Sequence, residues 1–182
     1  MVLTSCGTTQ PVGVWRDANY EPTPVHRIFV VENTSDTGDP VTLENAVALE
    51  IAIARALRSR GLEVTTSTAV FPLGPVDDEK VGAFVKDNRV DLVLALRGHV
   101  DDPLDPALLT YFTGDIKVYT AQRYPRVPIW IGAVRTFTAY ADTYGPGSEA
   151  RVPRPESVLQ RIAAPMAASV VRSLVKDQIL VL

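Results

Sequence analysis

The residue types best suited to metal or acid–base chemistry lie together in the stretch RGHVDDPLD, which contains His99, Asp101, Asp102 and Asp105. An imidazole beside hard carboxylates is a donor set that divalent metal ions accept. The stretch follows an apolar run that predicts a strand, and strand ends are where α/β sheets place their sites. The favoured interpretation is nevertheless a solvated acidic loop whose aspartates stabilise turns beside prolines. We therefore predict no metal site. The residues considered as weak candidates for one are His99, Asp101 and Asp102.

Other catalytic patterns are missing from the sequence. It has no G-x-S-x-G elbow, no P-loop, no H-E-x-x-H and no glycine-rich dinucleotide turn after a strand. Cys6 lies far along the chain from His26 and His99, so no Cys–His nucleophile pair is expected. We predict a non-catalytic protein without a cofactor. Two alternatives stay open, a metal-dependent enzyme and a soluble small-ligand-binding protein, both using the His99/Asp101 loop.

The single thiol belongs to Cys6 in the segment LTSCG, which resembles a bacterial lipobox. In that pattern a signal peptidase cuts before the cysteine, small residues such as Thr4 and Ser5 fit the protease, and the thiol takes the diacylglyceryl group. Residues 1 and 2 cannot supply the charged and apolar parts of a signal peptide, so we expect these upstream of Met1. Cys6 is therefore the predicted lipidation site, carrying palmitate or similar acyl chains. In the resemblance to Gram-negative lipoproteins, Gly7 rather than Asp directly after the cysteine implies the outer membrane.

Length and charge narrow the class of protein further. The 182 residues suit one domain, which we place at 25–182 after a lipobox remnant and tether at 1–24. A net charge of -3, with no clustered basic stripe, excludes an electrostatic case for nucleic acid. The apolar runs fall short of the roughly 20 residues that a membrane-spanning helix needs.

Hydrophobic patterning predicts a mixed α/β domain, an α+β sandwich with helices packed on a sheet of about five strands. The predicted order is β-α-β-α-β-β-β-α. Asp39 and Pro40 begin the first helix and Gly61 ends it. The third strand is the most apolar and should lie centrally, and the last two strands should form an antiparallel hairpin. The strands are expected at 26–32, from 62, at 90–98, from 114 and from 127, and the helices at 40–61, from 77 and at 155–176.

Aromatic side chains gather in the second half of the chain, and Tyr and Trp are favoured at protein interfaces. Cross-strand packing accounts for most of them without a partner. The remaining hypothesis is an interaction surface. Its candidate residues are Trp15, Tyr20, Tyr111, Trp130 and Tyr144.

The stretch VWRDANYEPTPVHRIFVV, followed by a long helix, RGLEV and RVDLVLALR, resembles a family of bacterial envelope lipoproteins of unknown function. The similarity covers nearly the whole chain from Cys6 and rests on Trp15, Asp17, Tyr20, Gly61 and Asp91. It implies a fold like the N-terminal domain of TolB and the curli-secretion lipoproteins. The family supplies no active site that could be carried over to this chain.

Together these observations predict an outer-membrane lipoprotein, anchored through Cys6, whose domain faces the periplasm and acts by binding or scaffolding. Its expected partners are the membrane, through the acyl chains, and an envelope protein. We also consider a second copy of the chain as a partner, in a homo-oligomer. Nucleic acid is excluded as a partner.

Overall fold

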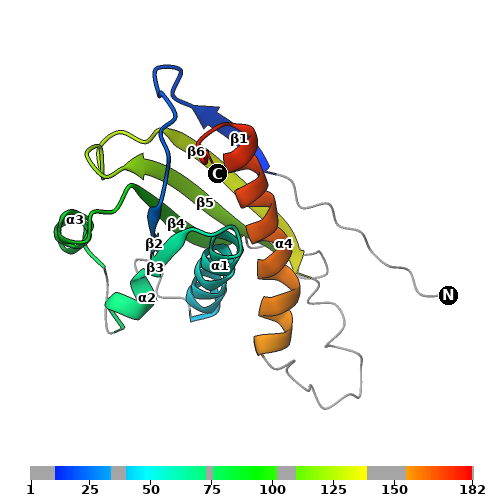
Figure 1. The fold of residues 1–182 in the computed structure, drawn as a ribbon. Helices are drawn as coiled ribbons and strands as arrows, with labels where there is room; N and C mark the ends of the chain where they lie inside the picture. The colour runs from blue at the N-terminus through cyan, green and yellow to red at the C-terminus, as the bar shows by residue number, and fades with distance from the viewer. Residues whose placement is uncertain (1–10, 34–39, 73–75, 102–109, 139–154, 182) are drawn as a thin grey trace, which may run out of the picture.

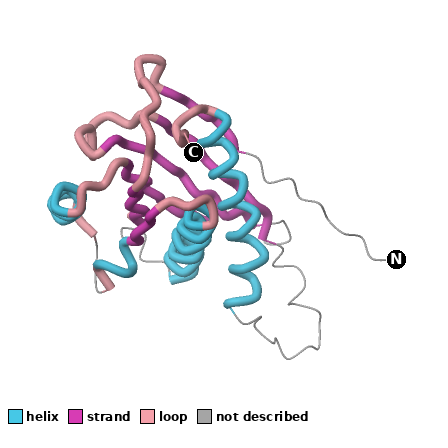
Figure 2. Tube along the Cα trace, in the orientation of Figure 1, coloured by secondary structure: helices cyan, strands magenta, loops and turns pink. Residues whose placement is uncertain are grey.

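The computed structural model describes residues 11–33, 40–72, 76–101, 110–138 and 155–181. Figures 1 and 2 show how the helices and strands of these segments are arranged. The elements in chain order are β1 (Pro11–Arg16), β2 (Arg27–Glu32), α1 (Pro40–Arg58), β3 (Glu63–Thr66), α2 (Ser67–Val70), α3 (Asp78–Asp87), β4 (Leu92–Asp101), β5 (Thr110–Thr120), β6 (Trp130–Thr138) and α4 (Pro155–Lys176).

The strands form one six-stranded sheet in the order β1-β6-β5-β4-β2-β3. Strand β2 lies between β3 and β4 and is parallel to both. Strands β4, β5, β6 and β1 pair antiparallel in succession. The predicted fold class, a mixed sheet with helices packed on it, is confirmed, and so is the antiparallel hairpin of β5 and β6.

Strand β1 corrects the prediction that all of residues 1–24 form a tether. Pro11–Arg16 pairs with β6, with Trp15 opposite Ile131 and Arg16 opposite Trp130. The sheet consequently has six strands, where about five were predicted. Proline and glycine in this stretch favour turns when read locally. The segment becomes a strand because β6 offers a sheet edge with which it can pair.

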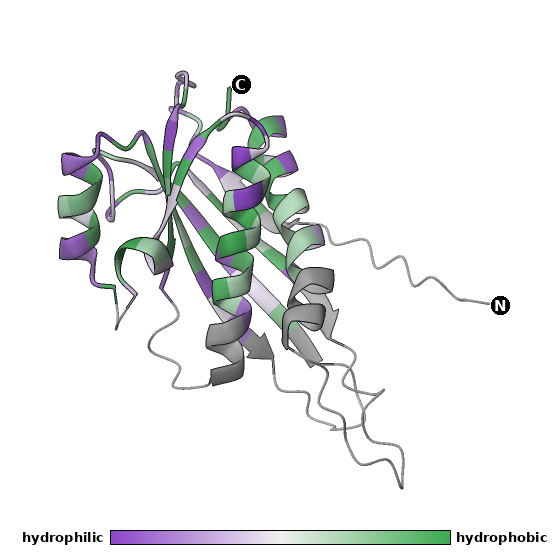
Figure 3. Cartoon of the chain, turned by 60° about the horizontal axis from the view of Figure 1, so that its bottom comes forward, coloured by the Kyte–Doolittle hydropathy of each residue, from purple (hydrophilic) through white to green (hydrophobic). Residues whose placement is uncertain are grey.

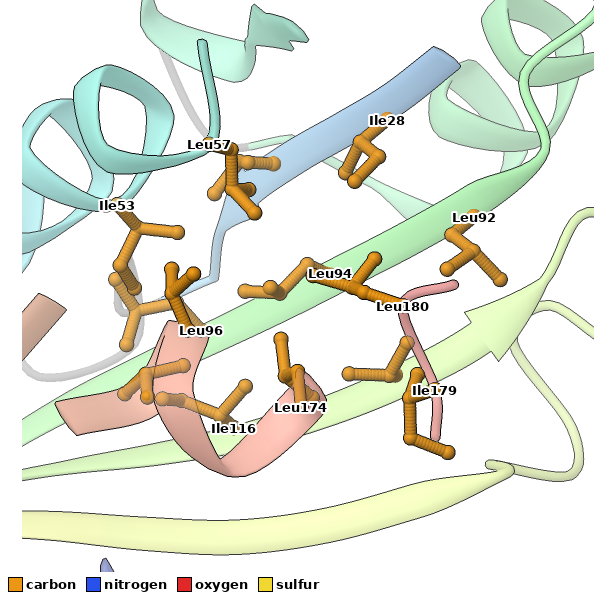
Figure 4. Packing of buried hydrophobic residues seen from close by; sticks show 14 of the residues in the cluster. Ile28, Ile53, Leu57, Leu92, Leu94, Leu96, Ile116, Leu174, Ile179 and Leu180 are labelled. Atoms are coloured by element: carbon orange, nitrogen blue, oxygen red, sulfur yellow. The ribbon is translucent and has the colours of Figure 1, made fainter. Parts of the chain in front are cut away.

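The two faces of the sheet carry separate cores, because side chains alternate along each strand. Leu92, Leu94 and Leu96 of β4 point toward α1 and α4, whereas Val93 points toward α3. Figure 3 shows α1 and α4 on one side of the sheet and α3 on the other. The connection from β2 through α1 to β3 moves one way across the sheet, and the connection from β3 through α3 to β4 moves back the other way. Because such crossovers are right-handed, the two helices lie on opposite faces. Figure 4 shows the larger core, under α1 and α4, where leucine and isoleucine side chains of strands and helices meet.

Helix ends follow the predicted local signals. Helix α1 ends at Arg58, and Gly61 beyond it has a φ of 86°, the left-handed conformation that glycine adopts readily. At α3, the Asp77 side chain accepts a hydrogen bond of 2.7 Å from the Lys80 amide. That cap and the acidic first turn suit the positive end of the helix dipole. The proposed cap of α1, Asp39, lies outside the described residues.

Close packing on the sheet depends on glycines in neighbouring strands. Gly98 and Gly114 lie directly opposite each other in β4 and β5. A Cβ atom at Gly114 would lie 2.7 Å from Leu49 Cδ2 of α1, so the missing side chain lets this helix approach the sheet. In β6, a Cβ atom at Gly132 would lie 2.3 Å from the ring of Trp130. The indole therefore lies where any larger residue at position 132 would place its side chain.

Candidate interaction surface

The edge formed by β1 is the most apolar exposed edge of the described sheet. Strand β1 is the terminal strand and pairs with β6 alone. Two adjacent residues of β1, Val14 and Trp15, are 43% and 47% exposed. A sheet edge with exposed apolar side chains is a template for pairing with another chain. Of the predicted interface residues whose exposure the structure describes, Trp15 is the accessible one.

Contacts at the end of β1 hold this edge in place. The amide of Asp17 donates to the Ile129 carbonyl at 2.9 Å, and its carboxylate accepts from the Asn19 amide at 2.9 Å. Arg123 Nη1 lies 2.6 Å from Asp17 Oδ2. The hydrogen bond from Asn19, and next the Arg123 guanidinium, lower the pKa of Asp17 below its ordinary value. These contacts fix the chain at Asp17, two residues after Trp15.

The opposite edge, at β3, is blocked. The Glu63 amide bonds to His26 on the β2 side at 2.9 Å, so the neighbouring Val64 carbonyl points to the outer edge. There it accepts two hydrogen bonds from Arg58, at 3.1 Å from Nε and 2.6 Å from Nη2. Strand β3 is also only four residues long and runs directly into α2. These are features by which proteins protect a sheet edge. Strand β1 has milder ones, a local register shift between Val12 and Trp15 and the residues Pro11 and Arg16 at its two ends.

The structure corrects the placement of the metal candidates in a loop. Strand β4 extends to Asp101, so His99 and Asp101 are strand residues opposite Thr113 and Tyr111. His99 Nδ1 lies 3.5 Å from Asp115 Oδ2 of β5. Asp102 and Asp105 lie outside the described residues. Within the described ranges, no group of three or more His, Cys, Asp and Glu side chains is placed to hold a metal ion.

Two of the predicted interface residues belong to the core. Trp130 is 1% exposed, and its Nε1 donates to Asp177 Oδ2 at 2.8 Å. Tyr20 is 7% exposed and packs in the same core. Neither side chain is available to a partner of the folded domain, which corrects their assignment. Tyr111 lies in β5, while Tyr144 and the lipidation candidate Cys6 lie outside the described residues.

A polar cleft of about 300 Å³ lies where α3 ends beside the starts of β2 and β3. Arg27 lines it, but its Nε already donates to Glu63 at 2.9 Å and its Nη1 to the Asn88 carbonyl at 3.3 Å. Sequence reasoning placed small-ligand binding at the His99/Asp101 loop and did not identify this cleft. Its walls come from three separate segments, so no local pattern signals it.

A buried carboxylate, missed by sequence reasoning, joins α1 to the end of β3. Glu50 is fully buried, and its Oε1 accepts from both the amide and the hydroxyl of Ser67 at 2.7 Å. Its Oε2 is buried without a hydrogen-bond partner. Burial raises the pKa of Glu50 above its ordinary value, and the hydrogen bonds from Ser67 offset part of that rise. The arrangement fixes the start of α2.

Among the helices of the described segments, none combines the length and the apolar character needed to cross a membrane.

No family model matches the chain, and no curated protein matches it. Among solved structures, the chain is similar to a variant of the PelC dodecamer from Paraburkholderia phytofirmans, with a TM-score of 0.52 and 13% identity, over 89% of this chain and 96% of that chain. Lipoprotein GNA1162 from Neisseria meningitidis matches with a TM-score of 0.44 and 11% identity, over 83% and 99% of the two chains. TolB from Acinetobacter baumannii matches with a TM-score of 0.30 and 15% identity, over 66% of this chain and 26% of TolB.

The comparison with the PelC variant shows a shared mixed α/β fold. At 13% identity the likeness concerns the fold alone, and the match to TolB is too low to add to it.

Proposed function

We propose that this protein is an outer-membrane lipoprotein, anchored through acyl chains on Cys6, whose periplasmic domain acts by binding copies of itself. The observation that carries the proposal is the exposed, apolar β1 edge, which bears Trp15 close along the chain to the lipobox-like LTSCG. The shared fold supports it, because PelC, a protein with a similar fold, is a dodecamer.

Cys6 and β1 lie close together along the chain, so a membrane anchor at Cys6 would also position the β1 edge. Five residue steps separate Cys6 from Pro11, so the covalent chain spans at most about 18 Å there. An acylated Cys6 would therefore hold β1 near the membrane surface. Confinement to one leaflet raises the effective concentration of anchored copies, which allows assembly through contacts that are weak in solution.

Binding rather than catalysis suits the polar groups that the structure describes. His99 lies in a strand beside Asp115 and not in a pocket with several acids. Arg27 of the polar cleft is engaged by Glu63 and by the Asn88 carbonyl. We propose on this basis that the domain is a structural member of an envelope assembly and not an enzyme.

Membrane fractionation tests the anchor. The chain would be expressed in a Gram-negative host behind a lipoprotein signal peptide, beside a Cys6→Ser variant behind a secretory signal peptide that is cleaved without lipidation. We expect the wild type in the outer-membrane fraction and the variant among soluble periplasmic proteins. A wild-type chain that fractionates with the soluble proteins would remove the anchor from the proposal.

A further inference from the structure

We propose that two copies of the chain join through their β1 edges, pairing antiparallel about a two-fold axis so that the two sheets become continuous. The inference rests on the self-assembly in the proposed function and names the surface that performs it. Its starting point is the difference between the two ends of the sheet.

Strand β1 presents backbone groups that can pair with another strand. The Asp17 amide bonds to Ile129, on the β6 side. Because antiparallel strands alternate the direction of their backbone groups, the N–H and C=O of the preceding Arg16 point away from β6. Its side chain is engaged within the domain, where Nη2 donates to the Tyr20 carbonyl at 3.2 Å. The outer edge of β1 thus offers both a donor and an acceptor.

The occupant of this edge is a second β1, because the other edge of the sheet cannot receive it. A head-to-tail arrangement would require β1 to pair with β3, whose outward Val64 carbonyl is already bonded to Arg58. Two identical edges related by a two-fold axis form an isologous interface. Within it, N–H groups meet C=O groups only when the strands run antiparallel.

The side chains of β1 are compatible with this pairing. Full overlap of residues 11–16 places Trp15 opposite Val12 of the second copy and Val14 opposite Gly13. It also places Arg16 opposite Pro11, whose carbonyl accepts from the Arg16 amide but which has no N–H to donate in return. Aromatic and β-branched pairs of this kind stabilise antiparallel strands. The charged Arg16 residues lie at opposite ends of the overlap, so like charges do not face each other. Pairing would also cover the two apolar side chains that are now exposed, Val14 and Trp15.

The test in solution uses the full chain carrying Cys6→Ser, with Val14→Lys as the variant and Val127→Lys as its control. Val127 is 52% exposed and lies outside β1, so the same substitution is made at a similarly exposed valine. Sedimentation equilibrium measures association, and thermal unfolding checks that both variants fold. We expect Val14→Lys to weaken association roughly tenfold or more, because it removes an apolar contact and adds charge to both edges. The control should associate like its parent.

A second arm uses the anchored protein in outer membranes, with Val14→Cys or Val127→Cys and a short thiol-to-thiol crosslinker. We expect crosslinked dimers from the cysteine at position 14 and none from that at 127, because residues near the two-fold axis meet their own copy. Association that survives Val14→Lys unchanged, without crosslinks at position 14, would overturn the β1 interface and leave self-assembly standing. A chain that is monomeric in both arms would contradict self-assembly itself, whatever the fractionation of Cys6 shows.

Discussion

Replacing Gly132 by alanine tests how closely the core is packed around Trp130. The added Cβ atom would lie 2.3 Å from the indole, so about 1 Å of movement is needed to restore ordinary carbon contacts of about 3.5 Å. The ring has little freedom to supply that movement, because it is 1% exposed and its Nε1 is bonded to Asp177.

The expected cost combines two effects. Overpacking a core costs about 1–3 kcal/mol, and losing a hydrogen bond to a charged group costs about 1.5–3 kcal/mol. We therefore expect Gly132→Ala to lower the free energy of unfolding by about 2.5–6 kcal/mol, a large part of the total for a domain of this size. Urea unfolding followed by circular dichroism measures the change, and the slope with urea should stay constant.

Two further variants make the Gly132 test specific. Gly82 lies inside α3, and a Cβ atom there would meet nothing within 4 Å, so Gly82→Ala should stabilise the protein by about 0.5–1 kcal/mol. Repeating Gly132→Ala in a Trp130→Phe background should reduce its cost, because a smaller ring leaves room. The reasoning fails if Gly132→Ala is as harmless as Gly82→Ala, or if its cost is the same with and without the indole.

Three other variants have expected outcomes. The raised pKa of Glu50 favours its protonated form in the folded state, so the stability that this group contributes falls as pH rises from the ordinary glutamate pKa through the folded value. Glu50→Gln should therefore weaken the dependence of the melting temperature on pH above the ordinary glutamate pKa, and parallel curves for variant and wild type would contradict this. The lowered pKa of Asp17 has the opposite effect: the stability that this group contributes is present above the ordinary aspartate pKa and is lost as pH falls through the folded value. Asp17→Asn should therefore make stability depend less steeply on pH in acid. Equal acid sensitivity of variant and wild type would count against the pairing with Arg123. Gly61→Ala should lower the melting temperature, because alanine is strained at a φ of 86°, and an unchanged value would mean that the turn relaxes.

Much of the fold could be predicted from local patterns, because these patterns have local causes. The apolar run of β4, the acidic start of α3 and the left-handed turn at Gly61 each depend on residues within a few positions. The hairpin of β5 and β6 followed from two β-rich runs joined by a short link that contains proline.

The errors concern contacts between distant parts of the chain. Strand β1 forms because β6, more than a hundred residues later, supplies its partner. Trp130 is buried because α4 covers it and Asp177 accepts from its indole, which its local surroundings do not indicate. His99 was expected in a loop because aspartates and prolines follow it, yet the ladder with β5 extends the strand as far as Asp101.

The difference between the two sheet edges has the same kind of origin. Arg58 belongs to a helix and Val64 to the next strand, and only the folded geometry brings the guanidinium onto the outward carbonyl. Trp15 could be recognised as a candidate interface residue from its type alone. Its position on the terminal strand of the sheet became evident only with the order of the strands.

The most direct test of an acylated, self-assembling envelope protein is native mass spectrometry of the mature chain, extracted in detergent from outer membranes. One spectrum reports both the modification of the terminal cysteine and the number of chains held together. We expect acyl chains on Cys6 and a mass corresponding to two or more copies. An unmodified chain that is present only as a monomer would contradict the account.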